Sequence, residues 1–487
     1  MARAGTPARH ATTVGARASG ARRAAIGGIV CAVIFGLTTH AKFSVDGDEP
    51  HYLLVAHSLV ADGDFDLANN YAAGDAGKFG REGLGSEHHA IRVPSGALRP
   101  VHDVGLPVVL APVYFVASRI APLAPVDLLA RFHMTPGSFT YALISLALLV
   151  VTVTGLMVLH TAIAVTALPA RADAVVLALG LAPPVLCNAF LVYPEIPALL
   201  LAAWVVKLGW TAPDRLRLRA MALAAAGLGL LPWMHRKFIP FAAGLLFVLA
   251  WRHRAWLGRL AFSTVAGLAL LIVVPVIAQS LSTAATWGDA GGPLLREGLP
   301  FSWHALQRGA PGLLFDRENG LFVWAPIYLI MPAAWWITRR ETWPLLVPAL
   351  LLYLPSAAHD AWWGGWSPVG RFLLPLVPLA AVPAVRALAA PTIRRAALAL
   401  LMPQAVMSAM AWQMPHVLWP RGQGVNLGLA AIPVVGARVQ AWLPSLRHEG
   451  VDARLWAALA IVLAGNAALA LFGRRALAGG GPPSAGA

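Results

Sequence analysis

The chain has 487 residues, of which 58% are hydrophobic and only 12% are charged, and its mean hydropathy is +0.67. Soluble domains carry about 25% charged residues, whereas apolar stretches of about 20 residues, each long enough to cross a bilayer as a helix, recur along this chain. This composition excludes a soluble enzyme, a disordered chain and a fibrous repeat. Because the apolar runs are continuous rather than alternating, a β-barrel is not expected, and we predict an all-α polytopic membrane protein.

The formal net charge of +15 comes from arginines that cluster between the apolar runs, so it does not indicate a nucleic-acid partner. Such clusters mark cytoplasmic loops according to the positive-inside rule. They are Arg215, Arg217 and Arg219; Arg252, Arg254 and Arg259; Arg339 and Arg340; Arg394 and Arg395; and Arg474 and Arg475. Together with the basic N-terminus, these clusters predict that both ends of the chain are cytoplasmic.

Residues 1–23 contain five arginines and no acidic residue. We expect them to form a disordered cytoplasmic tail, with a cleaved signal or transit peptide as the alternative. A single transmembrane domain is expected over residues 24–473, followed by a short cytoplasmic tail at 474–487.

The apolar segments of this domain are 24–42, 104–123, 138–168, 172–192, 195–212, 217–233, 238–251, 260–282, 320–337, 343–358, 369–388, 396–414 and 454–472. Because both ends are predicted to be inside, the number of crossings must be even, and one segment is expected not to cross fully. Prolines interrupt 104–123 and 172–192, which makes these two segments the candidates. We therefore predict a bundle of about 12 transmembrane helices, give or take one.

Three long connections are expected on the outer face, at about 43–103, 284–319 and 415–452. The first of them holds ten of the chain's 22 acidic residues and five of its 15 histidines. We therefore expect any chemistry to take place on the outer face.

The first outer loop opens with the motif GDEPHYLL, which contains Asp48 and Glu49. Apolar residues at helical spacing, including Tyr52, predict a helix over 50–61 that lies flat on the membrane surface. Capping of this helix, worth about 1 kcal/mol, explains one of the two acids but not the adjacent pair. Paired carboxylates can bind a cation or raise one pKa to produce a general base. Asp48 and Glu49 are therefore the candidate catalytic residues, and His51 and Tyr52 are candidate substrate contacts.

Downstream, Asp62, Asp64 and Asp66 alternate in a pattern similar to that of a calcium-binding loop. Leu67 and Ala73 occupy the positions where such a loop needs glycine and glutamate. A solvated turn is therefore the expected structure.

Two motifs place charge at the outer mouths of later spans. YPEIP puts Glu195 at a helix N-terminus, where an acid is either a partner of the helix dipole or part of a substrate site. PWMHRKF puts His235, Arg236 and Lys237 on the outer face, against the positive-inside trend. Unless this is a simple exception in topology, the three basic residues need an anion, which a donor phosphate or the acidic first loop can supply.

Two further motifs follow. FDRENG contains Arg317, which is either a substrate contact or part of a salt-bridged cap. HDAWWGGWSPVGRF is expected to form a rigid interfacial loop in which Trp363 and Trp366 either stack on sugar rings or anchor the loop in the aromatic belt. Arg371 begins the next helix, and a charge just inside the membrane boundary is costly unless it meets an anion. We therefore expect Arg371 to bind a phosphate.

Taken together, GDEPHYLL, YPEIP, FDRENGLFVWAP and WWGGWSPVGRF resemble a bacterial branch of predicted membrane glycosyltransferases. This branch belongs to the glycosyltransferase C-fold (GT-C) superfamily, which includes protein O-mannosyltransferases and lipid A aminoarabinose transferases. The resemblance covers about residues 24–390. It implies transfer of a sugar from a polyprenyl-phosphate-linked donor to a lipid, glycan or protein acceptor on the non-cytoplasmic face of a bacterial plasma membrane.

The resemblance also implies roles for individual residues. The Asp-Glu pair of the family maps onto Asp48 and Glu49, and an acid in this loop acts as catalytic base in several members. Because oligosaccharyltransferase uses such acids to hold a divalent metal, Mg²⁺ or Mn²⁺ bound by Asp48 and Glu49 is the cofactor to consider. Glu195 is the candidate for the second acidic position. The chain departs from oligosaccharyltransferase in lacking a WWDYG-type motif and a large soluble C-terminal domain, so asparagine-linked glycosylation is not expected.

Elementary chemistry agrees with this implication. Transfer from a lipid phosphate needs a base for the acceptor hydroxyl and cations for the departing phosphate, which Asp48, Arg371 and residues 235–237 can supply. The alternative function is a lipid-linked glycan flippase or transporter without transferase activity, although neither internal repeats nor midplane charges are evident. A degenerate homologue that acts as a subunit or scaffold is the third alternative.

Overall fold

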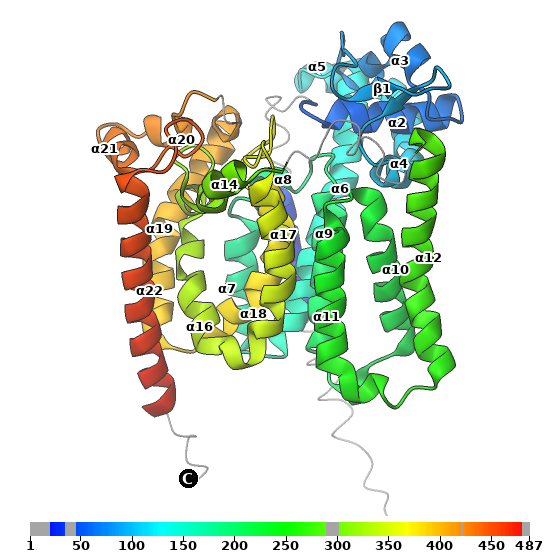
Figure 1. Cartoon of the computed structure of the whole chain (residues 1–487). Coiled ribbons are helices and arrows are strands. Elements are labelled where there is room, and N and C mark those ends of the chain that lie inside the picture. Colours follow the sequence, from blue (N-terminus) through cyan, green and yellow to red (C-terminus); the bar gives the residue numbers. More distant parts are fainter. Residues whose placement is uncertain (1–19, 35–44, 289–300, 420–421, 480–487) are drawn as a thin grey trace, which may run out of the picture.

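The structure, a computed structural model, describes residues 20–34, 45–288, 301–419 and 422–479. It is mostly helical, at 74%, and contains one small antiparallel sheet. Long helices run side by side beneath an outer layer that is built from the first outer loop and from later connections (Figure 1). This arrangement confirms the all-α expectation.

The helices of the bundle are residues 20–34, α4 (Gly105–Ile120), α6 (Pro136–Ala164), α7 (Pro169–Gly180), α9 (Glu195–Gly209), α10 (Leu218–Met234), α11 (Phe238–Leu257), α12 (Phe262–Trp287), α14 (Trp303–Phe315), α16 (Met331–Thr342), α17 (Leu346–Ala358), α18 (Val377–Ala387), α19 (Pro391–Gln413) and α22 (Ala453–Gly479). The shorter α-helices are α2 (Glu49–Ala61), α3 (Ala68–Ala73), α5 (Val126–Arg131), α8 (Val185–Asn188), α15 (Leu321–Trp324), α20 (Leu427–Ala430) and α21 (Val435–Trp442). The 3₁₀ helices are η1 (Asp75–Phe79), η2 (Ala121–Leu123), η3 (Pro213–Arg215), η4 (Pro326–Ile330), η5 (Trp343–Leu345), η6 (Arg371–Leu376) and η7 (Pro415–Leu418), and the sheet pairs β1 (Ala90–Arg92) with β2 (Leu98–Pro100).

Five of the described helices are long and apolar enough to cross a membrane, namely α4 extended through η2, α6, α12, α19 and α22. These helices indicate a membrane-embedded, multi-pass protein. Several other expected spans are divided, because proline removes a backbone donor and interrupts a helix. The segment 172–192 becomes α7 and α8, and 369–388 becomes η6 and α18. The described residues therefore contain fewer uninterrupted membrane-length helices than the number of crossings that we predicted.

The segment 104–123, one of the two candidates for incomplete crossing, forms α4 and, with η2, is long and apolar enough to cross a membrane. The Tyr114 hydroxyl in the middle of α4 lies 3.0 Å from Nδ1 of His57 in α2. The middle of this helix therefore packs against the outer-loop helix (Figure 1).

The expectation that the helix over 50–61 buries only one apolar stripe is wrong. The helix is present as α2, but every residue from Glu49 to Ser58 is buried. Leu53 and Leu54, which lie outside the expected stripe, are as buried as Tyr52. A helix that is buried on all sides lies inside a protein layer, and here α4 and η1 pack against it.

The Asp62–Asp66 segment is a turn, as expected. Asp64 accepts hydrogen bonds from the Ser58 hydroxyl and from the backbone N–H of Asp66. Asp66 accepts from the backbone N–H groups of Ala68 and Leu98. These carboxylates therefore satisfy local backbone donors.

The basic ends of the bundle lie opposite the acidic loop. The connections from α9 to α10 and from α11 to α12, which hold two of the arginine clusters, are at the end away from α2 (Figure 1). Residues 1–19 of the expected tail lie outside the described residues. Residues 20–23 are helical rather than disordered, and Arg22 forms an ion pair with Asp173.

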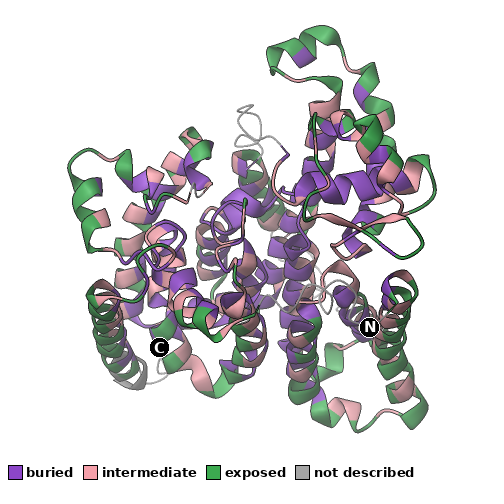
Figure 2. Cartoon of the chain, turned by 45° about the horizontal axis from the view of Figure 1, so that its top comes forward, coloured by how far each residue is buried: buried purple, intermediate pink, exposed green. Residues whose placement is uncertain are grey.

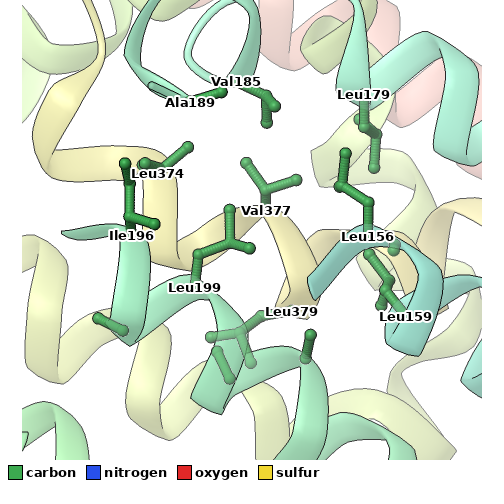
Figure 3. Packing of buried hydrophobic residues seen from close by; sticks show 14 of the residues in the cluster. Leu156, Leu159, Leu179, Val185, Ala189, Ile196, Leu199, Leu374, Val377 and Leu379 are labelled. Atoms are coloured by element: carbon green, nitrogen blue, oxygen red, sulfur yellow. The ribbon is translucent and has the colours of Figure 1, made fainter. Parts of the chain in front are cut away.

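A close-packed apolar core joins α6, α9 and α18. Leu156, Ile196, Leu199 and Val377 meet there (Figure 3), and van der Waals packing between such side chains holds membrane helices together. Buried positions concentrate where the helices meet one another and the outer layer, whereas exposed positions line the periphery (Figure 2). This core fixes the start of α9 and the short helix η6, both of which carry charged residues.

Candidate functional site

Four charged side chains from distant parts of the sequence meet beneath the outer layer. Arg371 donates from Nη1 to Oδ2 of Asp48 at 2.8 Å and from Nε to Oε1 of Glu195 at 3.2 Å. Lys237 donates from Nζ to the same Glu195 oxygen at 2.5 Å. We refer to Asp48, Glu195, Lys237 and Arg371 as the charged cluster.

Each member of the charged cluster stands at the start of a helix. Asp48 directly precedes α2, Glu195 opens α9, Lys237 directly precedes α11 and Arg371 opens η6. A helix N-terminus carries partial positive charge and therefore favours the two acids. The two bases are unfavourable there, so their stabilisation comes from the carboxylates. Arg371 also lies over the Tyr193 ring, 3.7 Å from its centroid, in cation–π contact.

Asp48 is the member of the charged cluster that solvent reaches most. Its side chain is 26% exposed, compared with 6% for Arg371 and 0% for Glu195. Burial raises the pKa of Asp48, but the charge of Arg371 and its hydrogen bond more than offset this and hold the pKa well below its usual range. The alternative that Asp48 only caps a helix is wrong, because its side chain makes no capping hydrogen bond.

Glu49 has a different environment from its neighbour. Its Oε1 accepts from the Tyr141 hydroxyl at 2.9 Å and from the Val192 backbone N–H at 2.7 Å. Burial raises the pKa of Glu49 to about 7, although these hydrogen bonds oppose the shift. Glu49 therefore connects α2 to α6 and to the 192–195 turn, and its role as a catalytic partner or joint metal ligand of Asp48 stays a prediction.

Tyr141→Phe is expected to lower the free energy of unfolding by about 1–2 kcal/mol, because a buried carboxylate loses a donor. Chemical unfolding of the purified protein in detergent measures this change. Tyr328→Phe is the matched control, because the buried Tyr328 hydroxyl has no hydrogen-bond partner among the described residues. Equal losses in the two variants would contradict the role of Glu49 as a structural connection.

Two polar atoms near the charged cluster are left without partners among the described residues. They are Oε2 of Glu195 and the hydroxyl of Tyr52, and both are buried. Buried polar atoms are normally hydrogen-bonded, and unpaired ones need an explanation such as water or a ligand. Tyr52 and Glu195 therefore remain candidate substrate contacts.

Three histidines of the outer layer adjoin Asp48, and sequence reasoning selected only one of them. His89 and His102 face each other with Nδ1 and Nε2 3.0 Å apart, and His102 Nε2 lies 3.9 Å from Asp48 Oδ1. The His51 ring stacks on His89 with 3.7 Å between centroids. Burial lowers the pKa of His51 to about 3 and that of His102 to about 4, so both are neutral at pH 7. The high histidine content of the loop was the available signal.

The basic motif at 235–237 divides between two places. Lys237 joins the charged cluster, whereas Arg236 donates from Nε to Oδ1 of Asp103 at 2.9 Å. His235 uses Nδ1 to accept from the backbone N–H of Lys237. The expectation that Arg236 contacts a donor phosphate is therefore replaced by an ion pair with the acidic first loop, which was the other anion considered.

Arg317 and Trp363 belong to a separate set of contacts. Arg317 donates to Glu449 at 3.2 Å, and Trp363 lies under Arg447, 4.2 Å from the guanidinium carbon. The first contact ties the 316–320 turn to the 440–450 segment, which favours the salt-bridged alternative for Arg317, and the second ties the loop of Trp363 to the same segment. The Trp366 ring is 66% exposed, so it remains available for a substrate or for the membrane interface.

Gly47, which directly precedes Asp48, lies very close to the backbone of Trp366. Gly47 has a φ of +58°, and a Cβ at this position would lie 2.5 Å from the carbonyl oxygen of Trp366. A residue with a side chain therefore meets both the left-handed conformational penalty and a clash. This contact couples the position of Asp48 to the loop that leads to Arg371.

Gly47→Ala is expected to reduce stability by about 1–3 kcal/mol more than Gly63→Ala. Gly63 also has a positive φ, +77°, but nothing lies within 4 Å of its Cβ position. Both variants lose about 1–2 kcal/mol from backbone strain, so the difference isolates the clash with Trp366. Thermal unfolding of the two variants in detergent measures it, and equal melting temperatures would contradict the contact.

An apolar cavity of about 360 Å³ is lined in part by η6, the short helix that begins at Arg371. It lies between η6 and helices α14 to α18, and its lining includes Leu314, Tyr328, Trp335, Tyr353, Leu373 and Leu376. Two of these residues follow Arg371 within η6. One short helix therefore contributes both to the charged cluster and to the apolar cavity.

No family model, curated protein or solved structure matches this chain, so the site is interpreted from its own geometry.

Proposed function

We propose that this protein is a membrane glycosyltransferase that moves a sugar from a polyprenyl-phosphate-linked donor to an acceptor on the non-cytoplasmic face. The observation that carries this proposal is the position of η6, which places Arg371 in the charged cluster and Leu373 and Leu376 in the apolar cavity. A lipid-linked sugar phosphate has the same two chemical parts. Its phosphate requires cations, and its polyprenyl tail requires apolar surface.

In this proposal Asp48 takes the proton of the acceptor hydroxyl, because it is the most solvent-accessible carboxylate of the charged cluster. Its low pKa makes it a weak base while Arg371 holds it, since an effective base has a pKa near the working pH. A donor phosphate competes with Asp48 for the same guanidinium. Donor binding would thereby return Asp48 toward its ordinary basicity and prepare it for the acceptor.

Lys237 and Arg371 would stabilise the phosphate as it departs. Glu195 would hold both cations in place, since it accepts a hydrogen bond from each. The GT-C architecture with about twelve crossings and the bacterial plasma membrane belong to the same proposal.

A lipid-linked glycan flippase or transporter is the competing function, because the cavity and the cations would also suit a lipid phosphate that is moved intact. The two functions differ in covalent outcome. Mass spectrometry of envelope glycans and glycolipids, with and without the protein, distinguishes them. Loss of one glycosyl modification supports transfer, and its mass identifies the sugar, whereas an export defect with every glycosidic linkage intact would refute it.

A further inference from the structure

Three potential ligand atoms converge on one point beside the charged cluster. One ring nitrogen each from His89 and His102 and a carboxylate oxygen of Asp48 all lie within 4.8 Å of one another. In a tetrahedral zinc site, bonds of about 2.0–2.1 Å place neighbouring ligand atoms about 3.3 Å apart. The observed separations of 3.0 Å between the two nitrogens and 3.9 Å from His102 to Asp48 bracket this value.

The two histidines are held by a regular element rather than by a free loop. They flank the open end of the β1–β2 hairpin, whose register pairs Ala90 with Pro100, and the His89 carbonyl accepts from the Val101 backbone N–H at 3.0 Å. Stacking of His51 fixes the plane of the His89 ring. Rigid support of this kind is what a metal site requires of its surroundings.

We propose that Asp48, His89 and His102 bind one divalent first-row transition-metal ion, with Zn²⁺ as the reference ion. Imidazole nitrogens suit such ions, whereas Mg²⁺ prefers a shell made of oxygen atoms. Three protein ligands leave a further position open for water or substrate. This set of ligands differs from the expected Mg²⁺ or Mn²⁺ site of Asp48 and Glu49, since Glu49 accepts hydrogen bonds from Tyr141 and Val192 instead of facing the two histidines.

The two oxygens of Asp48 can serve both neighbours. Oδ2 is bound to Arg371, and Oδ1 is the oxygen that faces His102. A metal on Oδ1 therefore leaves the ion pair with Arg371 in place.

The net charge of the charged cluster indicates what such an ion would contribute. In the charged cluster the carboxylates of Asp48 and Glu195 balance Lys237 and Arg371, so no net positive charge is left for a phosphate. A bound divalent ion would supply it, and it would lower the pKa of a hydroxyl at its open position. This consequence rests on the proposed function, whereas the metal site itself does not.

The test is metal binding by the purified full-length protein in detergent, without donor or acceptor. After removal of metal by a chelator, calorimetric titration with ZnCl₂ is expected to show one saturable site per chain. His89→Ala and His102→Ala are each expected to weaken binding by more than the roughly 10–100-fold that loss of an outer-shell partner typically costs, because each removes a direct ligand. Substitution with CoCl₂ should give visible absorption bands in the wild type and lose them in both variants.

His88→Asn is the matched control, because this exposed neighbour has a φ of +60° that asparagine tolerates. It should bind Zn²⁺ like the wild type, and far-UV circular dichroism should show that all variants are folded. Absence of a saturable site, equal affinity in the three variants, or tighter binding of Mg²⁺ than of Zn²⁺ would each overturn the assignment. A protein that binds Zn²⁺ here but transfers no sugar would refute the proposed function and leave the metal site standing.

Discussion

Asp48→Asn is expected to lower the rate of sugar transfer by about 10²–10⁴-fold, which is the usual contribution of a general base. Asparagine has nearly the same size, and its side-chain oxygen still accepts a hydrogen bond from Arg371, but it does not take up a proton. Because the Asp48 side chain is partly exposed, the amount of folded protein should stay close to that of the wild type. Transfer in membrane vesicles, normalised to protein abundance, measures the effect.

Asp46→Asn provides the matched control for this variant. Asp46 lies two residues earlier in the same loop, and its side chain is 39% exposed, with a long contact to Arg81 at 3.6 Å as its one ion pair among the described residues. Transfer by Asp46→Asn should therefore equal that of the wild type. Retention of activity by Asp48→Asn at normal abundance would contradict the role of Asp48 as the general base.

Glu195→Gln is expected to reduce the free energy of unfolding by about 3–5 kcal/mol, because removing one partner of a buried ion pair leaves an uncompensated charge. Glu195 is completely buried and accepts from both Lys237 and Arg371 through a single oxygen. Gln keeps the shape of the side chain but not its charge. Chemical unfolding in detergent measures the loss, and abundance in the membrane should fall with it.

Two comparisons isolate the cause of this loss. Glu87→Gln removes a negative charge from an exposed position of the outer layer, and it should change stability by less than about 0.5 kcal/mol. The double variant Glu195→Gln with Lys237→Met removes one of the stranded cations, so it should lose less than the sum of the two single variants. Equal unfolding of Glu195→Gln and Glu87→Gln would contradict the charged cluster as a structural element.

Much of the fold could be predicted from composition and hydropathy. Long apolar runs identify membrane helices because every backbone group must be satisfied within the lipid. The division of 172–192 and 369–388 into shorter helices follows from their prolines, but its extent depends on neighbouring helices. The burial of α2 could not be predicted, because a helix rich in apolar residues is equally suited to a membrane surface and to a protein layer. Only the packing of α4 and η1 decides between them.

The candidate site could be predicted one residue at a time but not as an arrangement. Unusual charges at helix starts singled out Asp48, Glu195, Lys237 and Arg371, yet Arg371 contacts Asp48 across 323 residues of sequence. A single sequence contains no signal that predicts such a contact. For the same reason the sequence predicted the same role for Arg236 and Lys237, although Arg236 contacts Asp103 and Lys237 contacts Glu195.

The central claim is that Asp48 serves transfer of a sugar, and one measurement tests it most directly. Mass spectrometry of envelope glycans and glycolipids compares a strain lacking the protein with strains restored by the wild type or by Asp48→Asn at equal abundance. We predict that one glycosyl modification disappears without the protein and returns only with the wild type. A profile that both proteins restore equally would contradict the role of Asp48, and a profile in which no linkage changes would contradict transfer itself.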